Sequence, residues 1–211
     1  MAIRTILTYP DPRLREKGLA VERITPEVER LIEDMAETMY GAPGVGLAAT
    51  QIGEKVRLFL VDVSTDEEPD NLLVFINPEI VSSEGDEVGP EGCLSFPGIT
   101  EDIKRKSRLT VRALDRRGQP FEIAADGLLA VAIQHESDHL DGVLMIDHMG
   151  VLKKRIIQRK MQKRALERAG AATRRGAGTR RRGAANPQTA EPRTSSAPAP
   201  QRSLQRPRPR R

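Results

Sequence analysis

Two of the three histidines in this 211-residue chain lie four positions apart, in the segment His135-Glu136-Ser137-Asp138-His139. On a helix, positions i and i+4 share a face, so both imidazoles can bind one metal ion. Glu136 is one step further round, close enough to act on a water activated by the metal without being a ligand. The alternative is a pair of surface histidines on an acidic turn, which the otherwise apolar surrounding helix disfavours. The spacing therefore predicts a metal-dependent hydrolase.

The third protein ligand of such a metal is not decided by residue types alone. Catalytic sites usually combine three protein ligands with an open position for water. His148 is the remaining histidine, but it lies beyond Gly142, where the helix should end. Cys93 is the only cysteine, so it forms no internal disulfide, which fits a reducing compartment. A lone cysteine is more often a small buried apolar residue than a ligand, and the choice stays open on chemistry.

Hydrophobic patterning predicts the elements that must position these residues. Thr25-Pro26-Glu27 is a typical helix start, and apolar residues at helical spacing follow as far as Gly41. A second helix should run from Asp126 to Gly142 with a buried, almost wholly apolar first half. The remaining predictions are strands over 56–63, 72–76, 109–114 and 121–124, the last two forming a hairpin, and a basic helix over 151–169. The predicted fold is α+β, with mixed or antiparallel strands packed around the central buried helix.

Charge is divided unevenly along the chain. Residues 151–211 hold 19 basic and 2 acidic residues, a net charge of +17, whereas residues 1–150 hold 15 basic and 28 acidic residues, a net charge of −13. An acidic body with a basic tail indicates a nucleic-acid partner, the alternative being a tail that is merely solvated. After Gly170 the composition turns to Arg, Ala, Pro, Gly, Ser and Thr, which predicts disorder. We therefore expect a catalytic domain over 1–169, including the basic helix, and a disordered tail over 170–211.

The chain contains no apolar run long enough for a signal peptide or a membrane span. The sequence thus predicts a soluble cytoplasmic protein without a membrane partner.

Three motifs together resemble those of one known family. GVGLAATQ at 44–51, EGCLS at 91–95 and QHESDHLDG at 134–142 are similar to the three motifs of the peptide deformylases, in order and at family-like separations. The resemblance runs from residue 9 to about residue 165, and the short gap between the first two motifs is typical of the bacterial and organellar type. It implies that Cys93, His135 and His139 bind the metal and that Glu136 is the catalytic acid/base.

The resemblance also implies the reaction, which is removal of the formyl group from N-formylmethionyl nascent peptides with release of formate. The Gln51 side chain and the Leu94 backbone N–H would stabilise the oxyanion. Glycines let the peptide backbone approach closely, and apolar residues would form the methionine pocket, although core packing is the alternative for those on the helix. The substrate-binding residues implied are Gly44, Val45, Gly46, Glu91, Leu128, Val131 and Ala132.

Iron(II) is the native ion that the resemblance implies, with zinc, nickel or cobalt able to occupy the site. The implied partner is the ribosome near its exit tunnel, bound through the basic C-terminal segment. Its charge comes from Lys153, Lys154, Arg155, Arg159, Lys160, Lys163 and Arg164, and from the tail arginines Arg174, Arg175 and Arg180 to Arg182.

Two features depart from the family pattern. Many members have an Arg or Tyr a few residues after EGCLS, where this chain has Thr100, and the tail beyond about residue 170 has no counterpart.

Two other functions compete with this interpretation. An HExxH endopeptidase would need a third His or Glu ligand at protease spacing, which the sequence does not offer. A ribosome- or RNA-binding module with a structural metal would usually supply four protein ligands, and only three are evident.

Overall fold

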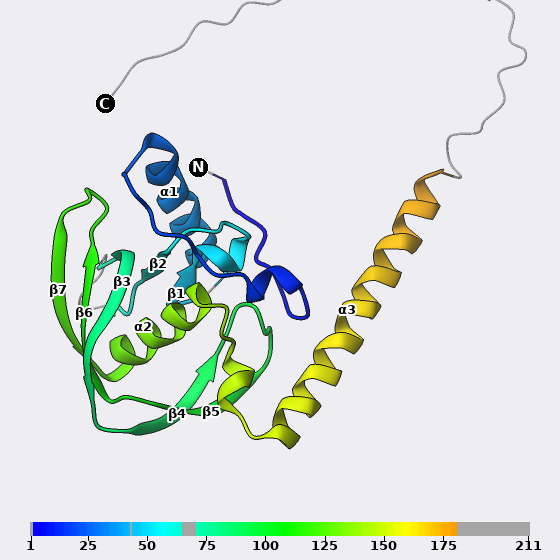
Figure 1. Ribbon diagram of the computed structural model, residues 1–211. Helices are drawn as coiled ribbons and strands as arrows, with labels where there is room; N and C mark the ends of the chain where they lie inside the picture. The colour runs from blue at the N-terminus through cyan, green and yellow to red at the C-terminus, as the bar shows by residue number, and fades with distance from the viewer. Residues whose placement is uncertain (1, 43, 65–70, 181–211) are drawn as a thin grey trace, which may run out of the picture. The chain divides into compact units, whose positions relative to one another are not determined.

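The computed structural model describes residues 2–42, 44–64 and 71–180 (Figure 1). Its helices are α1 (Pro26–Gly41), α2 (Gly127–Leu140) and α3 (Val151–Arg180), with short 3-10 helices η1 (Pro12–Arg15), η2 (Ala49–Ile52) and η3 (Met145–His148). The strands are β1 (Gly46–Ala48), β2 (Leu58–Val61), β3 (Leu73–Glu84), β4 (Glu87–Gly92), β5 (Thr100–Arg105), β6 (Arg108–Leu114) and β7 (Pro120–Asp126).

Five strands form one sheet in the order β1-β2-β3-β6-β7, and β4 and β5 form a separate pair. Every neighbouring pair of strands is antiparallel. The predicted α+β class with antiparallel strands is confirmed, and so is the predicted hairpin, which corresponds to β6 and β7.

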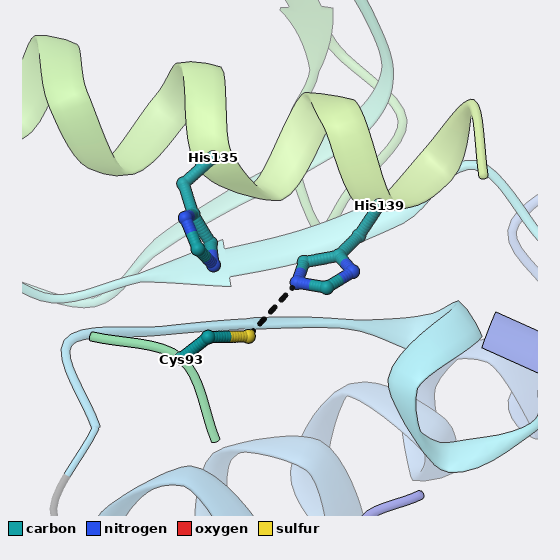
Figure 2. A group of neighbouring side chains, drawn as sticks. All are labelled: Cys93, His135 and His139. Carbon is teal, nitrogen blue, oxygen red and sulfur yellow. Dashed lines mark hydrogen bonds between the residues drawn. The ribbon is translucent and has the colours of Figure 1, made fainter. Parts of the chain in front are cut away.

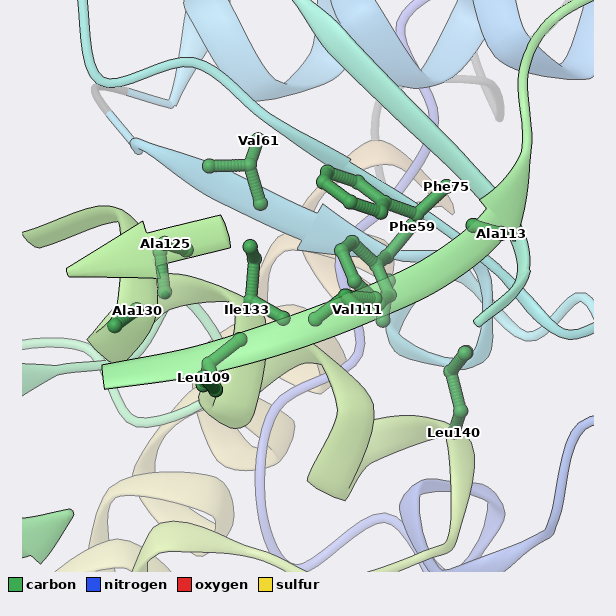
Figure 3. Packing of buried hydrophobic residues seen from close by; sticks show 12 residues of the cluster. Phe59, Val61, Phe75, Leu109, Val111, Ala113, Ala125, Ala130, Ile133 and Leu140 are labelled. Atoms are coloured by element: carbon green, nitrogen blue, oxygen red, sulfur yellow. The ribbon is translucent and has the colours of Figure 1, made fainter. Parts of the chain in front are cut away.

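The large sheet is buried on both faces near β2. Successive side chains of a strand point to opposite faces. Leu58 and Leu60 pack in a cluster with Met35 of α1, whereas Phe59 packs in a second cluster with Ile133 of α2 (Figure 3). The sheet therefore lies between α1 and α2, and α2 is fixed against it by its apolar side.

The prediction that the first half of α2 is buried is only partly correct. Ala130 and Ile133 are fully buried, but Leu128 is 57% exposed. Leu128 differs because it faces the cavity described below instead of the sheet.

Between residues 73 and 105 the structure has longer and more numerous strands than the sequence predicted. β3 was expected to end at Ile76, but it continues to Glu84 through register shifts after Ile76. Asn77, with φ of 52°, and Pro78 interrupt the apolar pattern there, which hides the continuation. β4 contains two glycines and a proline, residues that disfavour strands. Its conformation depends on pairing with β5, a tertiary contact.

α3 also exceeds its predicted range, because the helix continues past residue 169 to Arg180. Alanine and arginine favour helix strongly enough to extend it past Gly170. By internal contacts the chain divides into two units, Met1–Gly170 and Ala171–Arg211. The expected disorder of 181–211 lies outside the described residues, and the domain boundary at 169 stays a prediction. Within the described ranges, no helix has the length and apolar character to cross a membrane.

Candidate active site

Three potential metal ligands converge from two parts of the chain. Cys93 follows β4, while His135 and His139 lie one turn apart on α2 (Figure 2). Their ligand atoms all lie within 4.8 Å of one another, and Cys93 Sγ is 3.3 Å from His139 Nε2. In the part of the chain that the structure describes, this is the one group of three or more His, Cys, Asp or Glu side chains close enough to share an ion. A thiolate and two imidazoles suit zinc or iron(II).

His139 is prepared for this role by its surroundings. It is 1% exposed, and burial together with the nearby His135 holds its pKa well below the ordinary value. A neutral imidazole is the form that binds metal.

Glu91 orients the other imidazole. Its Oε2 lies 2.9 Å from His135 Nδ1, which leaves Nε2 of that ring for an ion. Arg105 donates from Nε and Nη2 to the two Glu91 oxygens, at 2.7 and 3.0 Å. Burial alone would raise the pKa of Glu91, but the hydrogen bonds from His135 and Arg105 outweigh it and lower the pKa to about 2. Glu91 is therefore a carboxylate whose two oxygens are both engaged by Arg105 and His135, and the peptide contact expected of it stays a prediction.

Sequence reasoning missed Arg105, which links this pair to a second carboxylate. Arg105 Nη1 donates to Asp138 Oδ2 at 2.6 Å, and the same oxygen lies 2.7 Å from His148 Nε2. His148 thus pairs with Asp138 and lies outside the ligand group. Ile103 and Arg105 lie at alternate positions of β5, and both are buried. This alternation would have identified Arg105 as an inward-facing residue, but only once β5 itself is recognised as a strand.

Glu136 is buried beside the ligands, with 4% of its surface exposed. Its Oε2 has no hydrogen-bond partner among the described residues. Burial raises the pKa of Glu136 to about 7, although the charge of His135 opposes the shift. A cation held by the neighbouring ligands would lower the pKa again. A carboxyl group with one unpartnered oxygen that titrates near neutrality is suited to proton transfer.

Gln51 is held with its amide nitrogen directed at the Cys93 loop. Gln51 Oε1 accepts a hydrogen bond from Ala48 N at 2.8 Å, and Nε2 donates to Ser95 Oγ at 3.2 Å. Gln51 Nε2 also lies 3.7 Å from Cys93 Sγ. The Gln51 side chain is 1% exposed, so its donor position is fixed by burial as well as by these contacts.

A cavity of about 460 Å³ is lined by every predicted site residue except the fully buried His139. Its lining includes every predicted substrate-binding residue, namely Gly44, Val45, Gly46, Glu91, Leu128, Val131 and Ala132. Cys93, Leu94, His135, Glu136 and Gln51 line it as well, and so do Pro97 to Thr100. A larger hollow of about 580 Å³ around Asp138 and His148 contains none of the three candidate ligands. The smaller cavity is the better candidate, because its apolar walls surround a few converging polar groups.

Comparison with known proteins gives one consistent result. Residues 3–155 match the sequence model of the polypeptide deformylase family. The chain is 52% identical over 166 residues to peptide deformylase 2 of Xanthomonas campestris pv. campestris, a match that covers 77% of this chain and 96% of that protein. It is also 52% identical over 163 residues to the peptide deformylase of Alkalilimnicola ehrlichii, covering 77% and 91%.

Solved structures agree with the sequence matches. The crystal structure of a peptide deformylase from Legionella pneumophila superposes with a TM-score of 0.75 at 47% identity, covering 80% of this chain and 98% of that one. Peptide deformylase from Ehrlichia chaffeensis in complex with actinonin superposes with a TM-score of 0.73 at 36% identity, covering 78% and 98%.

Proposed function

The chain belongs to the polypeptide deformylase family and removes the N-terminal formyl group of newly made polypeptides, and we propose that Cys93, His135 and His139 hold its metal ion. Deformylases are metalloenzymes, and the clustering of these three side chains is the observation that carries the proposal. Neither an endopeptidase nor a non-catalytic module fits the family. When bound, a divalent ion lowers the pKa of a water molecule to about 7 and polarises the formyl oxygen.

Glu136 moves the proton in this proposal. Its unpaired Oε2 takes a proton from the attacking water and passes it to the leaving amine. As a carboxylate this group accepts the proton, and as the resulting carboxylic acid it returns the proton to the leaving amine.

Gln51 Nε2 and the Leu94 backbone N–H donate to the oxygen that becomes negatively charged as the formyl carbon is attacked. Both residues line the cavity beside Cys93. Loss of one such donor costs about 3–4 kcal/mol of transition-state stabilisation.

The peptide itself binds along β1. In the sheet order β1 is an edge strand, paired with β2 on one side only. An edge strand can accept an extended peptide as a further strand. Gly44, Val45 and Gly46 bring that edge to the cavity, while Leu128 and Val131 form the apolar wall for the methionine side chain.

Iron(II) is the native ion in our proposal, with zinc, nickel and cobalt as replacements, and the enzyme works in the cytoplasm. Metal analysis of protein purified without oxygen tests the identity of the ion. A thiolate ligand beside iron(II) should make formate release sensitive to oxygen, and a zinc-loaded, oxygen-insensitive native enzyme would contradict the choice of iron.

The assignment of Glu136 is tested by Glu136→Gln, which keeps the size of the side chain but removes its acid/base function. Formate release from a formyl-Met peptide should fall by about 10²–10⁴-fold, with bound metal retained. The matched control is Glu122→Gln, at an exposed position of β7 that pairs with Arg112. A rate for Glu136→Gln within a few-fold of the control would remove Glu136 from the mechanism.

The ribosome is the proposed partner of α3. Arg155, Arg159, Lys160 and Lys163 are exposed on the described part of this helix. Contacts to ribosomal phosphates would be electrostatic and would weaken steeply with salt. Deleting the helix would also remove Ile157, which is 3% exposed and packs in the core. Variants that change only the charge of exposed side chains therefore test docking without disturbing the fold.

The variant Arg159→Ala/Lys160→Ala should weaken co-sedimentation with ribosomes and reduce the salt slope by about 2. Arg116→Ala/Arg117→Ala is the matched control, because it removes two exposed charges from the β6–β7 turn. Equal binding by the two variants, or equal competition by unrelated RNA and by ribosomes, would refute specific docking.

A further inference from the structure

One wall of the candidate active-site cavity is built from a loop. Pro97, Gly98 and Ile99 line the cavity, followed by Thr100 at the start of β5. Residues 93–99 belong to neither a helix nor a strand. Hydrogen bonds from Phe96 N to the Cys93 carbonyl and from Ile99 N to the Phe96 carbonyl shape the loop itself, and contacts with other parts of the chain hold it in place.

α3 supplies apolar contacts to that loop. Phe96 is fully buried and Ile99 is 6% exposed, and both pack in one cluster with Ile157 and Met161 of α3. Apolar packing of this kind holds the loop against the helix, but it does not fix the direction of any one carbonyl group.

Arg164 of α3 provides a directional contact to the cavity-lining part of the loop. Its Nη1 donates to the Pro97 carbonyl oxygen at 2.6 Å, a short bond from a charged donor. The next residue, Gly98, has φ of 68°, and a Cβ added there would lie 3.7 Å from Arg164 Nη1. The guanidinium group therefore lies against the outer side of the loop whose inner side faces the substrate cavity.

We propose that Arg164 is a positioning residue for the deformylation substrate. By holding the Pro97 carbonyl group from outside the cavity, it fixes the position of one cavity wall. The peptide residues that follow the formylated methionine run along that wall. This inference rests on the proposed function. The sequence counted Arg164 among the charges that dock on the ribosome, but Arg164 is half-buried and bonded to the loop, so α3 gains a role in substrate binding that is separate from its exposed basic side chains.

The proposal separates binding from chemistry. Arg164 touches neither the candidate ligands nor Glu136, so its loss should leave kcat within about twofold. KM for formyl-Met peptides of four or more residues should rise by about three- to tenfold, the size of one ordinary hydrogen bond, because Arg164 acts on the peptide only through the loop. KM for formyl-Met amide, which hardly extends beyond the methionine, should change by less than twofold.

The test compares Arg164→Ala with Lys163→Ala in the metal-loaded enzyme, measuring formate release from both substrates. Lys163 is the matched control, because it is the adjacent cation on the same helix, its side chain is 79% exposed, and its ion pair is a long one of 4.0 Å with Glu167 on the same helix. Arg164→Lys keeps one donor and should give an intermediate KM for the long peptide. It also keeps the test available if Arg164→Ala fails to fold.

A selective rise in KM for the long peptide in Arg164→Ala, with Lys163→Ala unchanged, supports the proposal. Equal KM values in the two alanine variants, or an equal loss of kcat on both substrates, would overturn it. A wild-type enzyme that releases no formate would instead contradict the proposed function, so the two failures are distinguishable.

Discussion

Gly46→Ala should damage catalysis without removing the metal. A Cβ added at Gly46 would lie 2.6 Å from Glu136 Oε1, 2.9 Å from its Cγ and 3.0 Å from its Cδ. Ordinary contact begins at 3.4 Å, so the carboxyl group must move by about 0.8 Å. Displacing a catalytic group by about 1 Å can cost about 100-fold in rate. We therefore expect kcat for formate release to fall by about 100-fold.

The three atoms nearest to this methyl group all belong to Glu136, and none of them belongs to a candidate ligand. Bound metal, measured by elemental analysis, should thus stay at the wild-type ratio. Gly89→Ala is the matched control, because a Cβ there has no neighbour within 4 Å. If Gly46→Ala kept kcat within threefold of Gly89→Ala, the placement of the Glu136 carboxyl group would not be critical and the reasoning would fail.

Three further predictions concern the ligands and stability. Cys93→Ala should lose the metal and nearly all formate release, whereas His148→Ala should keep both; metal content of the two variants decides between them. Glu91→Gln should weaken metal binding by about 10–100-fold, because His135 loses the carboxylate that orients it; chelator competition measures this, and unchanged affinity would contradict it. Although burial opposes it, pairing with Arg15 and Lys154 lowers the pKa of Asp147. Its stabilising contribution is therefore fully present above the unfolded-state pKa of about 3.9 and is lost progressively as the pH falls from that value through the lower folded-state pKa. The melting temperature of the wild type should thus exceed that of Asp147→Asn at about pH 6, and a difference that does not shrink by about pH 3 would refute the assignment.

Local patterns were sufficient wherever the information lies within a few residues. The helix that begins after Thr25 was predicted from its proline, its acidic first turn and its apolar spacing, and α1 spans Pro26–Gly41. The hairpin was predicted from two apolar runs around a turn. The shared face of His135 and His139 follows from helix geometry alone.

Residue types alone could not identify the third candidate metal ligand. They left Cys93 and His148 as alternatives, and the family motifs favoured Cys93. Cys93 lies 46 residues from His139 in sequence, yet their side chains approach to 3.3 Å. His148 is much nearer in sequence, but it pairs with Asp138 instead. The separation in sequence therefore did not predict which of the two side chains lies beside His135 and His139.

By itself the sequence determined the helices, the hairpin and the histidine pair, because each depends on side chains within about one turn or one strand of one another. Tertiary structure alone decided the rest. It decided that β4, despite its glycines and proline, is a strand, because the pairing with β5 supplies what local propensity lacks. It also decided that Arg105 is buried on Glu91 and that Arg164 holds the Pro97 carbonyl, because both bonds join segments that only the packed fold brings together.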